Sequence, residues 1–317
     1  VVPELAITGY PPEDLLLKPS FVEASRRTLE RLIPLTEGIT AVVGGVDRGR
    51  QGTLYNTATV LANGRVAAVY RKRCLPNYGV FDEQRYFMPG TRSVIIMRGG
   101  VRIGLTICED LWETAPCREL AAAGAQLVIN LSASPYYAGK GHERQRLFSR
   151  RAKHHHMAIA YCNLVGGQDE LIFDGASLFL DAQGRLVARG RQFQEDFVVV
   201  DVPQARGDRP PMVAHRPPAL SPVEEVYDAL ALGVRDYVRK NGFSTVVLGL
   251  SGGVDSALTA CLAVDALGAD HVVGVVMPSR FSSRATQEDA RRLADTLGIE
   301  RRQIAISSST NGSSRGR

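Results

Sequence analysis

Short apolar runs alternate with longer segments of helical periodicity along almost the whole chain. The runs with the length and composition of strands are 41–46, 94–97, 102–107, 126–131, 158–164, 176–180, 197–202, 246–250 and 272–277. The segments in which apolar residues recur as on an amphipathic helix are 21–37, 142–155, 222–241, 256–268 and 286–298. Alternation of strands with helices favours an α/β architecture.

One proline-rich segment interrupts this alternation. Residues 201–221 contain five prolines and neither strand nor helix periodicity, which is typical of a linker. After it the pattern restarts as the opening of a doubly wound domain, and the chain ends in the polar, low-complexity sequence SSSTNGSSRGR. We therefore predict a first domain at 1–203, a linker at 204–221, the first part of a second domain at 222–306 and a disordered tail at 307–317.

Composition and charge exclude several classes of protein. With 44% hydrophobic and 22% charged residues among 317, the chain has the composition of a soluble globular protein. No apolar run approaches the roughly 18 residues of a membrane-spanning helix, and no signal peptide is visible. The net charge of +5 is concentrated in residues 301–317, which hold four arginines and no acids. No basic face for nucleic acid is indicated.

The use of cysteine points to a reducing compartment. The five cysteines are odd in number and widely spaced, which argues against a disulfide framework and against paired zinc ligands. We therefore expect a cytoplasmic protein. The chain also lacks an initiator methionine, and we expect that it begins within a longer protein or has been trimmed.

The segment VVLGLSGGVDSALTA joins a strand to a helix through a glycine turn. Gly252 and Gly253 allow a tight bend that brings several N–H groups to one point. The hydroxyls of Ser251 and Ser256, with the positive end of the helix dipole, complete a cradle suited to pyrophosphate. Asp255 is a suitable ligand for the Mg²⁺ that accompanies a nucleotide. The alternative is a turn that only joins the strand to the helix.

This turn resembles the SGGxDS motif of the PP-loop ATP pyrophosphatases, which split ATP into AMP and pyrophosphate. It is not a Walker A loop, because no GK[ST] follows its second glycine. The resemblance implies an ATP site made by Gly249, Leu250, Ser251, Gly252, Gly253, Val254, Asp255 and Ser256.

Three reactive groups are predicted at strand ends of the first domain. Cys108 ends the run VRIGLTIC, where we expect the chain to present the thiol rather than bury it. The adjacent carboxylates Glu109 and Asp110 would raise its pKa, so a cation and a base are needed to form a thiolate. Glu4 and Lys72, each where an apolar strand meets a loop, supply a carboxylate and an amine. Without these partners, a small buried structural thiol would be the simpler interpretation.

A carboxylate, an amine and a thiol in this order resemble the Glu–Lys–Cys triad of the nitrilase (carbon–nitrogen hydrolase) superfamily. The wordings PELAITGYPPEDLL, KRCLPNYGVFDEQRYF and TICEDLW resemble the glutaminase domain of the glutamine-dependent NAD synthetase family, whose second domain carries a PP-loop. The resemblance implies a nitrilase-like α-β-β-α sandwich followed by an incomplete, doubly wound, Rossmann-like parallel sheet. It also implies that Glu4 is the general base, Lys72 the cation beside the oxyanion and Cys108 the nucleophile.

The same resemblance implies the substrates and their contacts. Glutamine would be held by Tyr78, Ser134 and Lys140, while Glu83 would orient Lys72. ATP with Mg²⁺ would serve as substrate nucleotide without a covalently bound cofactor, and Arg280 would border its site. The family makes NAD from deamido-NAD with ammonia from glutamine, releasing AMP and pyrophosphate, and it forms homo-oligomers. Two alternatives remain open: a stand-alone nitrilase-type amidase and an inactive, truncated pseudo-enzyme.

Two further features give weaker indications of function. His154–His156 end a basic helix without the spacing of metal ligands, which makes a metal site improbable. The basic run 144–153 alternates with apolar residues, and we expect a solvated helix face or an oligomer contact.

Overall fold

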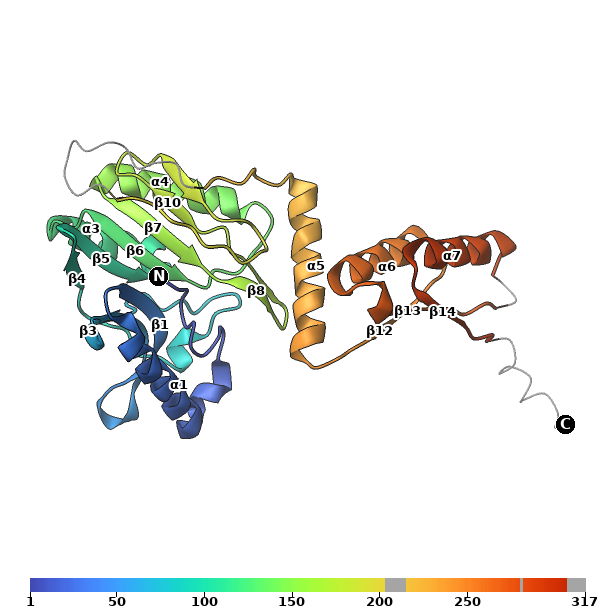
Figure 1. The fold of residues 1–317 in the computed structure, drawn as a ribbon, viewed down its shortest axis with the longest axis horizontal. Coiled ribbons are helices and arrows are strands. Elements are labelled where there is room, and N and C mark those ends of the chain that lie inside the picture. The colour runs from blue at the N-terminus through green and yellow to red at the C-terminus, as the bar shows by residue number, and fades with distance from the viewer. Residues whose placement is uncertain (203–214, 280–281, 307–317) are drawn as a thin grey trace. The chain divides into compact units, whose positions relative to one another are not determined.

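The computed structural model describes residues 1–202, 215–279 and 282–306, and the chain divides into two compact units. The first unit comprises Val1–Gly166 and Ile172–Pro222, and the second comprises Gly167–Leu171 with the chain from Val223 onward. Figure 1 draws the elements of both units with the labels used below.

The first sheet of the first unit is an antiparallel meander. Its strands are β1 (Thr40–Arg48), β2 (Leu54–Ala62) and β3 (Arg65–Arg71). Asn63 and Gly64 join β2 to β3 with positive φ at both residues, as a two-residue Asn-Gly hairpin requires. The amphipathic helix α1 (Pro19–Leu32) packs against β1.

The second sheet has six strands with a parallel centre. In spatial order they are β11 (Leu186–Arg189), β10 (Leu178–Leu180), β7 (Ala158–Asn163), β6 (Leu127–Ser132), β5 (Val101–Ile107) and β4 (Ile95–Arg98). Strands β5, β6 and β7 run parallel and the outer strands run antiparallel to their neighbours. Parallel neighbours need crossover connections, which here contain α2 (Glu109–Trp112), α3 (Thr114–Ala122) and α4 (Lys140–His155).

Two hydrophobic cores hold these layers together. Between the sheets, Val42 and Val60 of the first pack with Leu105 and Ile129 of the second. On the other face of the second sheet, buried side chains of its strands pack with Leu120, Phe148 and other residues of the helices. The layers therefore run helix, sheet, sheet, helix, and the predicted α-β-β-α sandwich is confirmed. A separate two-stranded ribbon consists of β8 (Val165–Gln168) and β9 (Leu171–Asp174).

The second unit contains three parallel strands with helices between them. Its elements are α5 (Pro222–Lys240), β12 (Val246–Gly249), α6 (Val254–Leu267), β13 (Val272–Val276), α7 (Arg284–Leu297) and β14 (Glu300–Gln303). Figure 1 shows α6 and α7 on the same face of this sheet, where Ala260, Ala290 and Ala294 are buried. Such an arrangement is the opening of a doubly wound sheet. Gly268 and Gly298 follow the two helices as C-caps with positive φ, which glycine adopts most readily.

Several predicted elements differ in the structure. Residues 197–202 form no strand, although Val198, Val200 and Val202 pack on the inter-sheet core and Phe197 is 88% exposed. The apolar pattern at 197–202 therefore reflects side chains packed on the core and not a strand paired with a neighbour. Strands β2, β8, β9, β11 and β14 and helices α2 and α3 were not predicted.

Parts of the predicted linker and tail lie outside the described residues. These parts are 204–214 of the linker and the whole tail at 307–317, whereas 215–221 has no regular secondary structure. Within the described part of the chain, every helix is too short or too polar to cross a membrane.

Candidate active site

Two of the three reactive side chains follow directly on strands. Lys72 comes after the last residue of β3 and Cys108 after the last residue of β5, as predicted. Glu4 lies in a turn instead of the expected strand. This turn packs directly on β1, because a Cβ at Gly44 would come within 2.2 Å of the Pro3 carbonyl oxygen. Only glycine leaves room for so close an approach of backbone to backbone.

Glu4 and Lys72 form a fully buried ion pair. The Lys72 Nζ atom lies 2.7 Å from Glu4 Oε1 and 2.8 Å from Glu83 Oε1, and the Glu4 and Lys72 side chains have no exposed surface. One ammonium group thus joins two carboxylates, which offsets part of the hydration that all three charges lose on burial.

The cluster shifts the pKa values of its members. Burial acts to lower the pKa of Lys72, but the charges of Glu4 and Glu83 raise it well above its ordinary value. Burial raises the pKa of Glu83 to about 7, with the Glu4 charge adding to the rise and the Lys72 charge opposing it. At neutral pH Lys72 is therefore charged, and Glu83 takes up a proton more readily than an ordinary glutamate.

Cys108 occupies a strained turn between β5 and α2. Its φ of 41° and ψ of −102° fall in a region that residues other than glycine rarely adopt, and such strain is concentrated at functional sites. Cys108 is only 3% exposed, so the expectation that the strand end presents the thiol is wrong. The strand carries it into the interface between the two sheets, where it belongs to the inter-sheet core.

The thiol is protonated in the resting protein. Burial and the Glu4 carboxylate raise the pKa of Cys108 to about 12, whereas Lys72 and a hydrogen bond with Ser132 lower it. The main causes are therefore burial and Glu4 rather than the adjacent Glu109 and Asp110. A base must take the thiol proton before or during attack on a substrate.

The three residues predicted to hold glutamine lie on different elements. The Tyr78 hydroxyl donates to the Glu109 carboxylate at 3.1 Å, and Lys140 Nζ, at the start of α4, donates to the Pro135 carbonyl at 2.7 Å. Ionisation of Cys108 would raise the pKa of both Tyr78 and Lys140, as expected of groups that lie near the thiol. Ser134 is buried, and its N–H donates to Asn163 Oδ1 at 3.0 Å.

Sequence reasoning missed the remaining partners of Glu4. Asn56 Nδ2 donates to Glu4 Oε1 at 2.7 Å, and the Ala133 N–H donates to Glu4 Oε2 at 3.0 Å. Both carboxylate oxygens are thus occupied and the side chain is fixed. A buried asparagine within the apolar run LYNTATVLA was a readable signal. The backbone contact of Ala133 leaves no recognisable signal in the sequence.

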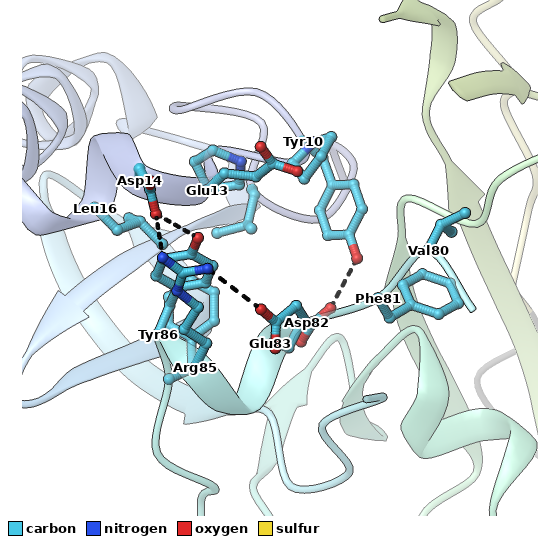
Figure 2. Close-up of a pocket in the computed structure, with 14 residues that line it drawn as sticks. Tyr10, Glu13, Asp14, Leu16, Val80, Phe81, Asp82, Glu83, Arg85 and Tyr86 are labelled. Atoms are coloured by element: carbon cyan, nitrogen blue, oxygen red, sulfur yellow. Dashed lines mark hydrogen bonds and ion pairs between the residues drawn. The ribbon is translucent and has the colours of Figure 1, made fainter. Parts of the chain in front are cut away.

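A pocket of about 180 Å³ adjoins the outer side of this cluster. Figure 2 shows Tyr10 and Glu83 facing one another on its wall, with the Tyr10 hydroxyl donating to Glu83 Oε1 at 2.9 Å. Asp14 pairs there with Arg85 and accepts from the Tyr86 hydroxyl. Glu83 belongs to this wall and also forms the ion pair with Lys72.

The basic run 144–153 is not uniformly solvated, in contrast to the prediction. Arg144 is 1% exposed and forms a bidentate pair with Asp174 at 2.5 and 3.2 Å. Asp174 also accepts from Asn163 Nδ2 at 3.0 Å. Because Asn163 Oδ1 accepts from the Ser134 N–H, the buried pair fixes the loop that follows β6.

The triple histidine shows no metal-site geometry. The rings of His154 and His155 contact each other edge to face. Among the described residues, no group of three His, Cys, Asp or Glu side chains is placed to hold a metal ion.

The glycine turn of the second unit has the predicted connection from β12 to α6. Gly252 has a φ of 82°, and a Cβ there would come within 2.1 Å of the Thr286 carbonyl oxygen, so only glycine fits. The first-turn N–H groups of α6 have no acceptor within the helix. They remain available to an anion.

The two serines bond to each other and to the turn. Ser251 and Ser256 Oγ atoms are 3.0 Å apart, and their oxygens accept from the N–H groups of Gly253 and Ser251 at 3.2 and 3.3 Å. These two N–H groups are therefore already engaged.

The other residues of the predicted nucleotide site differ in access. Gly249, Val254 and Asp255 are exposed. The Leu250 side chain lies in the core and its N–H donates to the Val275 carbonyl, so only its carbonyl could reach a nucleotide. Arg280 lies outside the described residues.

Comparison with known proteins assigns the first unit. Residues 1–209 match the sequence profile of the carbon–nitrogen hydrolases. The chain belongs to the carbon–nitrogen hydrolase family. Residues 226–315, after the carbon–nitrogen hydrolase unit, match the profile of NAD synthase.

Relatives extend the similarity over both units. The chain is 43% identical to the glutamine-dependent NAD(+) synthetase of Thermotoga maritima and 45% identical to that of Xylella fastidiosa, over 95% and 96% of its own length. These alignments cover 58% and 56% of the two relatives, so the chain spans less than three fifths of their length.

Some solved structures resemble the whole chain and others resemble about three fifths of it. The glutamine-dependent NAD+ synthetase of Acinetobacter baumannii, solved with ADP, is similar over 100% of this chain and 61% of that one, with a TM-score of 0.93 and 38% identity. An amidase of Nesterenkonia, from the nitrilase superfamily, is similar over 60% of this chain and 72% of its own, with a TM-score of 0.53 and 28% identity. A variant of that amidase carries the acetamide moiety of fluoroacetamide on its active site cysteine.

Proposed function

We propose that the first unit hydrolyses the side-chain amide of glutamine, with Cys108 as nucleophile, Glu4 as general base and Lys72 as the cation beside the oxyanion. The observation that carries the proposal is the fully buried Lys72–Glu4 pair, whose two charges act on the pKa of Cys108 in its strained, buried turn. A buried ion pair of this kind is expensive to maintain and is expected where its charges act in a reaction.

Each group has a state suited to its proposed step. Glu4 accepts the proton of the thiol as Cys108 Sγ attacks the amide carbon. Charged Lys72, with a backbone N–H next to Cys108, stabilises the oxyanion of the tetrahedral intermediate. The proton passes from Glu4 to the leaving nitrogen. Ammonia then departs from the tetrahedral intermediate, which leaves a thioester on Cys108 Sγ. Water then attacks the thioester with Glu4 again as base, which releases glutamate and restores the thiol.

The other proposed contacts concern binding. Tyr78, Ser134 and Lys140 would hold glutamine, and Glu83 would orient Lys72 through the contact at 2.8 Å. Burial lowers the pKa of Lys140 and ionisation of Cys108 would raise it, which supports a place for Lys140 beside the substrate.

In the second unit, we propose that the turn at 249–256 binds the phosphates of ATP. The first-turn N–H groups of α6 and the serine hydroxyls are the donors that a pyrophosphate needs. Asp255 is exposed in this first turn and offers a single carboxylate. Mg²⁺ usually takes one or two protein carboxylates and completes its shell with phosphate and water oxygens, so the residues present fit a nucleotide-borne ion. When bound, the ion would neutralise phosphate charge.

For the whole protein, we propose glutamine-dependent synthesis of NAD. Ammonia from the first unit would amidate deamido-NAD in a reaction driven by ATP, with AMP and pyrophosphate as products. The relatives named for this activity support the proposal. We further propose that it acts in the cytoplasm, which the five free cysteines support. We also propose that it is a homo-oligomer, on the basis of the family resemblance.

The deciding experiment compares Cys108→Ala with Cys117→Ala, a matched change of another buried cysteine. We expect Cys108→Ala to abolish release of glutamate and ammonia from glutamine, Cys117→Ala to retain it, and both to bind ATP as the wild type does. Near-normal hydrolysis by Cys108→Ala would sink the nucleophile assignment. If the wild type hydrolysed simple amides but not glutamine, the result would support a stand-alone amidase. If it hydrolysed neither, the result would support an inactive pseudo-enzyme.

A further inference from the structure

Asp110, two residues after Cys108, is completely buried. Its carboxylate accepts four hydrogen bonds, two on each oxygen. Oδ1 accepts from the N–H groups of Arg73 and Cys74 at 3.1 and 2.8 Å. Oδ2 accepts from the Tyr70 hydroxyl and the Ile107 N–H at 2.8 and 2.9 Å. The accepting capacity of the group is fully used.

The four donors fall into two sets with a clear relation to the proposed catalytic groups. Three of them belong to the chain around Lys72, at the end of the first sheet. The fourth, Ile107, immediately precedes Cys108 at the end of β5 in the second sheet. One carboxylate therefore ties the backbone that carries the ammonium to the backbone that carries the thiol.

The contact with Ile107 also holds the strained turn. Asp110 reaches back three residues to the Ile107 N–H, so the side chain closes a loop over Cys108. With φ of 41° and ψ of −102°, Cys108 needs such over-determination to stay in place.

We propose that Asp110 is a positioning residue that sets the placement of Lys72 relative to Cys108. This inference rests on the proposed roles of those two groups. Asp110 itself takes no part in proton transfer, because all four of its acceptor sites are held by protein donors that do not react. A misplacement of about 1 Å between reacting groups can reduce a rate about 10²-fold.

Positioning and mere support of the fold predict opposite effects on Cys108. If Asp110 only held the turn closed, its loss would loosen the turn and make the buried thiol more accessible to a small alkylating agent. If Asp110 places Lys72, its loss takes away the cation that favours the thiolate, and alkylation slows. Each unit of thiol pKa corresponds to about a tenfold change in thiolate below that pKa.

The test measures alkylation of Cys108 by iodoacetamide at a fixed pH, with the modified peptide identified by mass spectrometry and Cys108→Ala as background. For Asp110→Asn we expect alkylation about tenfold slower than in the wild type, and kcat for glutamine about 10²-fold lower with KM little changed. Asp181→Asn is the matched control, because Asp181 also accepts several hydrogen bonds within a turn, in a different part of the fold. It should lose stability and leave alkylation unchanged.

Alkylation of Asp110→Asn at or above the wild-type rate would overturn the proposal. Should Asp110→Asn not fold, Tyr70→Phe removes one of the four donors while keeping the ring. We expect a fall of a few-fold in its alkylation rate, and an unchanged rate would count against the proposal. If the wild type is alkylated at Cys108 but does not hydrolyse glutamine, the proposed function fails while the comparison of rates still decides the role of Asp110.

Discussion

Tyr10 donates its hydroxyl proton to the same oxygen of Glu83 that lies 2.8 Å from Lys72 Nζ. This hydrogen bond lowers the pKa of Glu83 against the burial that raises it to about 7. A residue on the wall of the outer pocket thereby acts on a carboxylate of the buried cluster (Figure 2).

The first prediction concerns Tyr10→Phe. Loss of the hydroxyl should raise the pKa of Glu83, so that more of the carboxylate is neutral at pH 6–7 and Lys72 is less well held. The acidic limb of kcat/KM for glutamine hydrolysis should move to higher pH, with little change above pH 8. Tyr86→Phe is the control, since Tyr86 lines the same pocket but bonds to Asp14 instead. An unshifted limb in Tyr10→Phe would contradict the link.

The second prediction is that Lys72→Ala costs both activity and stability. It leaves Glu4 and Glu83 buried without their shared cation, a change that costs about 3–5 kcal/mol of unfolding free energy. Glutamine hydrolysis should fall at least ~10²-fold. Urea unfolding and initial rates measure the two effects. Arg185→Ala breaks an ion pair to Asp181 in which the arginine side chain is 69% exposed, and it should cost at most about 1 kcal/mol.

The third prediction concerns the pH dependence of stability. The folded pKa of Glu83 is about 7, raised from an unfolded value of 4.5, so between these values the folded state binds the proton that the unfolded state has released. Stability from this group therefore falls as pH rises through that window. Glu83→Gln should flatten that part of the profile of unfolding free energy against pH.

Glu119 offers a control of opposite sign for this measurement. Hydrogen bonds from Arg73 and Ser93 lower the pKa of Glu119 to about 2, so its stabilisation is lost only as pH falls from 4.5 toward 2. Glu119→Gln should change the profile in that acidic range and leave the range from 4.5 to 7 as in the wild type. Identical profiles for Glu83→Gln and the wild type would refute the shifted Glu83.

The fourth prediction separates space from backbone strain at the glycine turn. Gly252→Ala combines a positive φ with a collision against the Thr286 backbone, whereas Gly298→Ala has a similar φ of 68° and open space. The φ strain costs about 1–2 kcal/mol, and only Gly252→Ala adds the collision. We expect a larger loss of stability and of ATP binding for Gly252→Ala, measured by thermal unfolding and calorimetry. Equal losses would mean that the turn yields to the added methyl group.

The fifth prediction tests the division of labour in a protein that carries the complete ligase segment. Asp255→Ala should reduce NAD synthesis from glutamine and from free ammonia alike, because it weakens the neutralisation of pyrophosphate charge. Cys108→Ala should lose only the glutamine-driven reaction. If Asp255→Ala kept ammonia-dependent synthesis, the glycine turn would be a structural connection and no nucleotide site.

Local pattern was enough to predict helix α4 and most strands that carry the candidate site, but not the short helix α2 that follows Cys108. Lys72 and Cys108 could be placed because each directly follows an apolar strand, which periodicity reveals. The contacts of Glu4 with Asn56 and of Tyr10 with Glu83 join residues 52 and 73 positions apart, which no local pattern encodes.

Burial was the property that sequence predicted least well. Arg144 belongs to a basic run that reads as solvated, yet Asp174, 30 residues later, neutralises it in the interior. Strand β14 (Glu300–Gln303) is instead a strand without buried residues. All four of its residues are exposed, and its sequence lacks the apolar pattern of a buried strand. Its place is determined by backbone pairing with β13.

The contact of Glu4 with the Ala133 N–H connects the turn on β1 to the end of β6, and so joins the two sheets of the first unit. The meander β1–β2–β3 can form early, because its strands are neighbours in sequence. The parallel strands β5, β6 and β7 require long loops to close before they pair, which is slow. The Lys72–Glu4 cluster can therefore take its final form only when both sheets have docked. During refolding, the return of glutamine hydrolysis should follow this last step and trail the recovery of secondary structure.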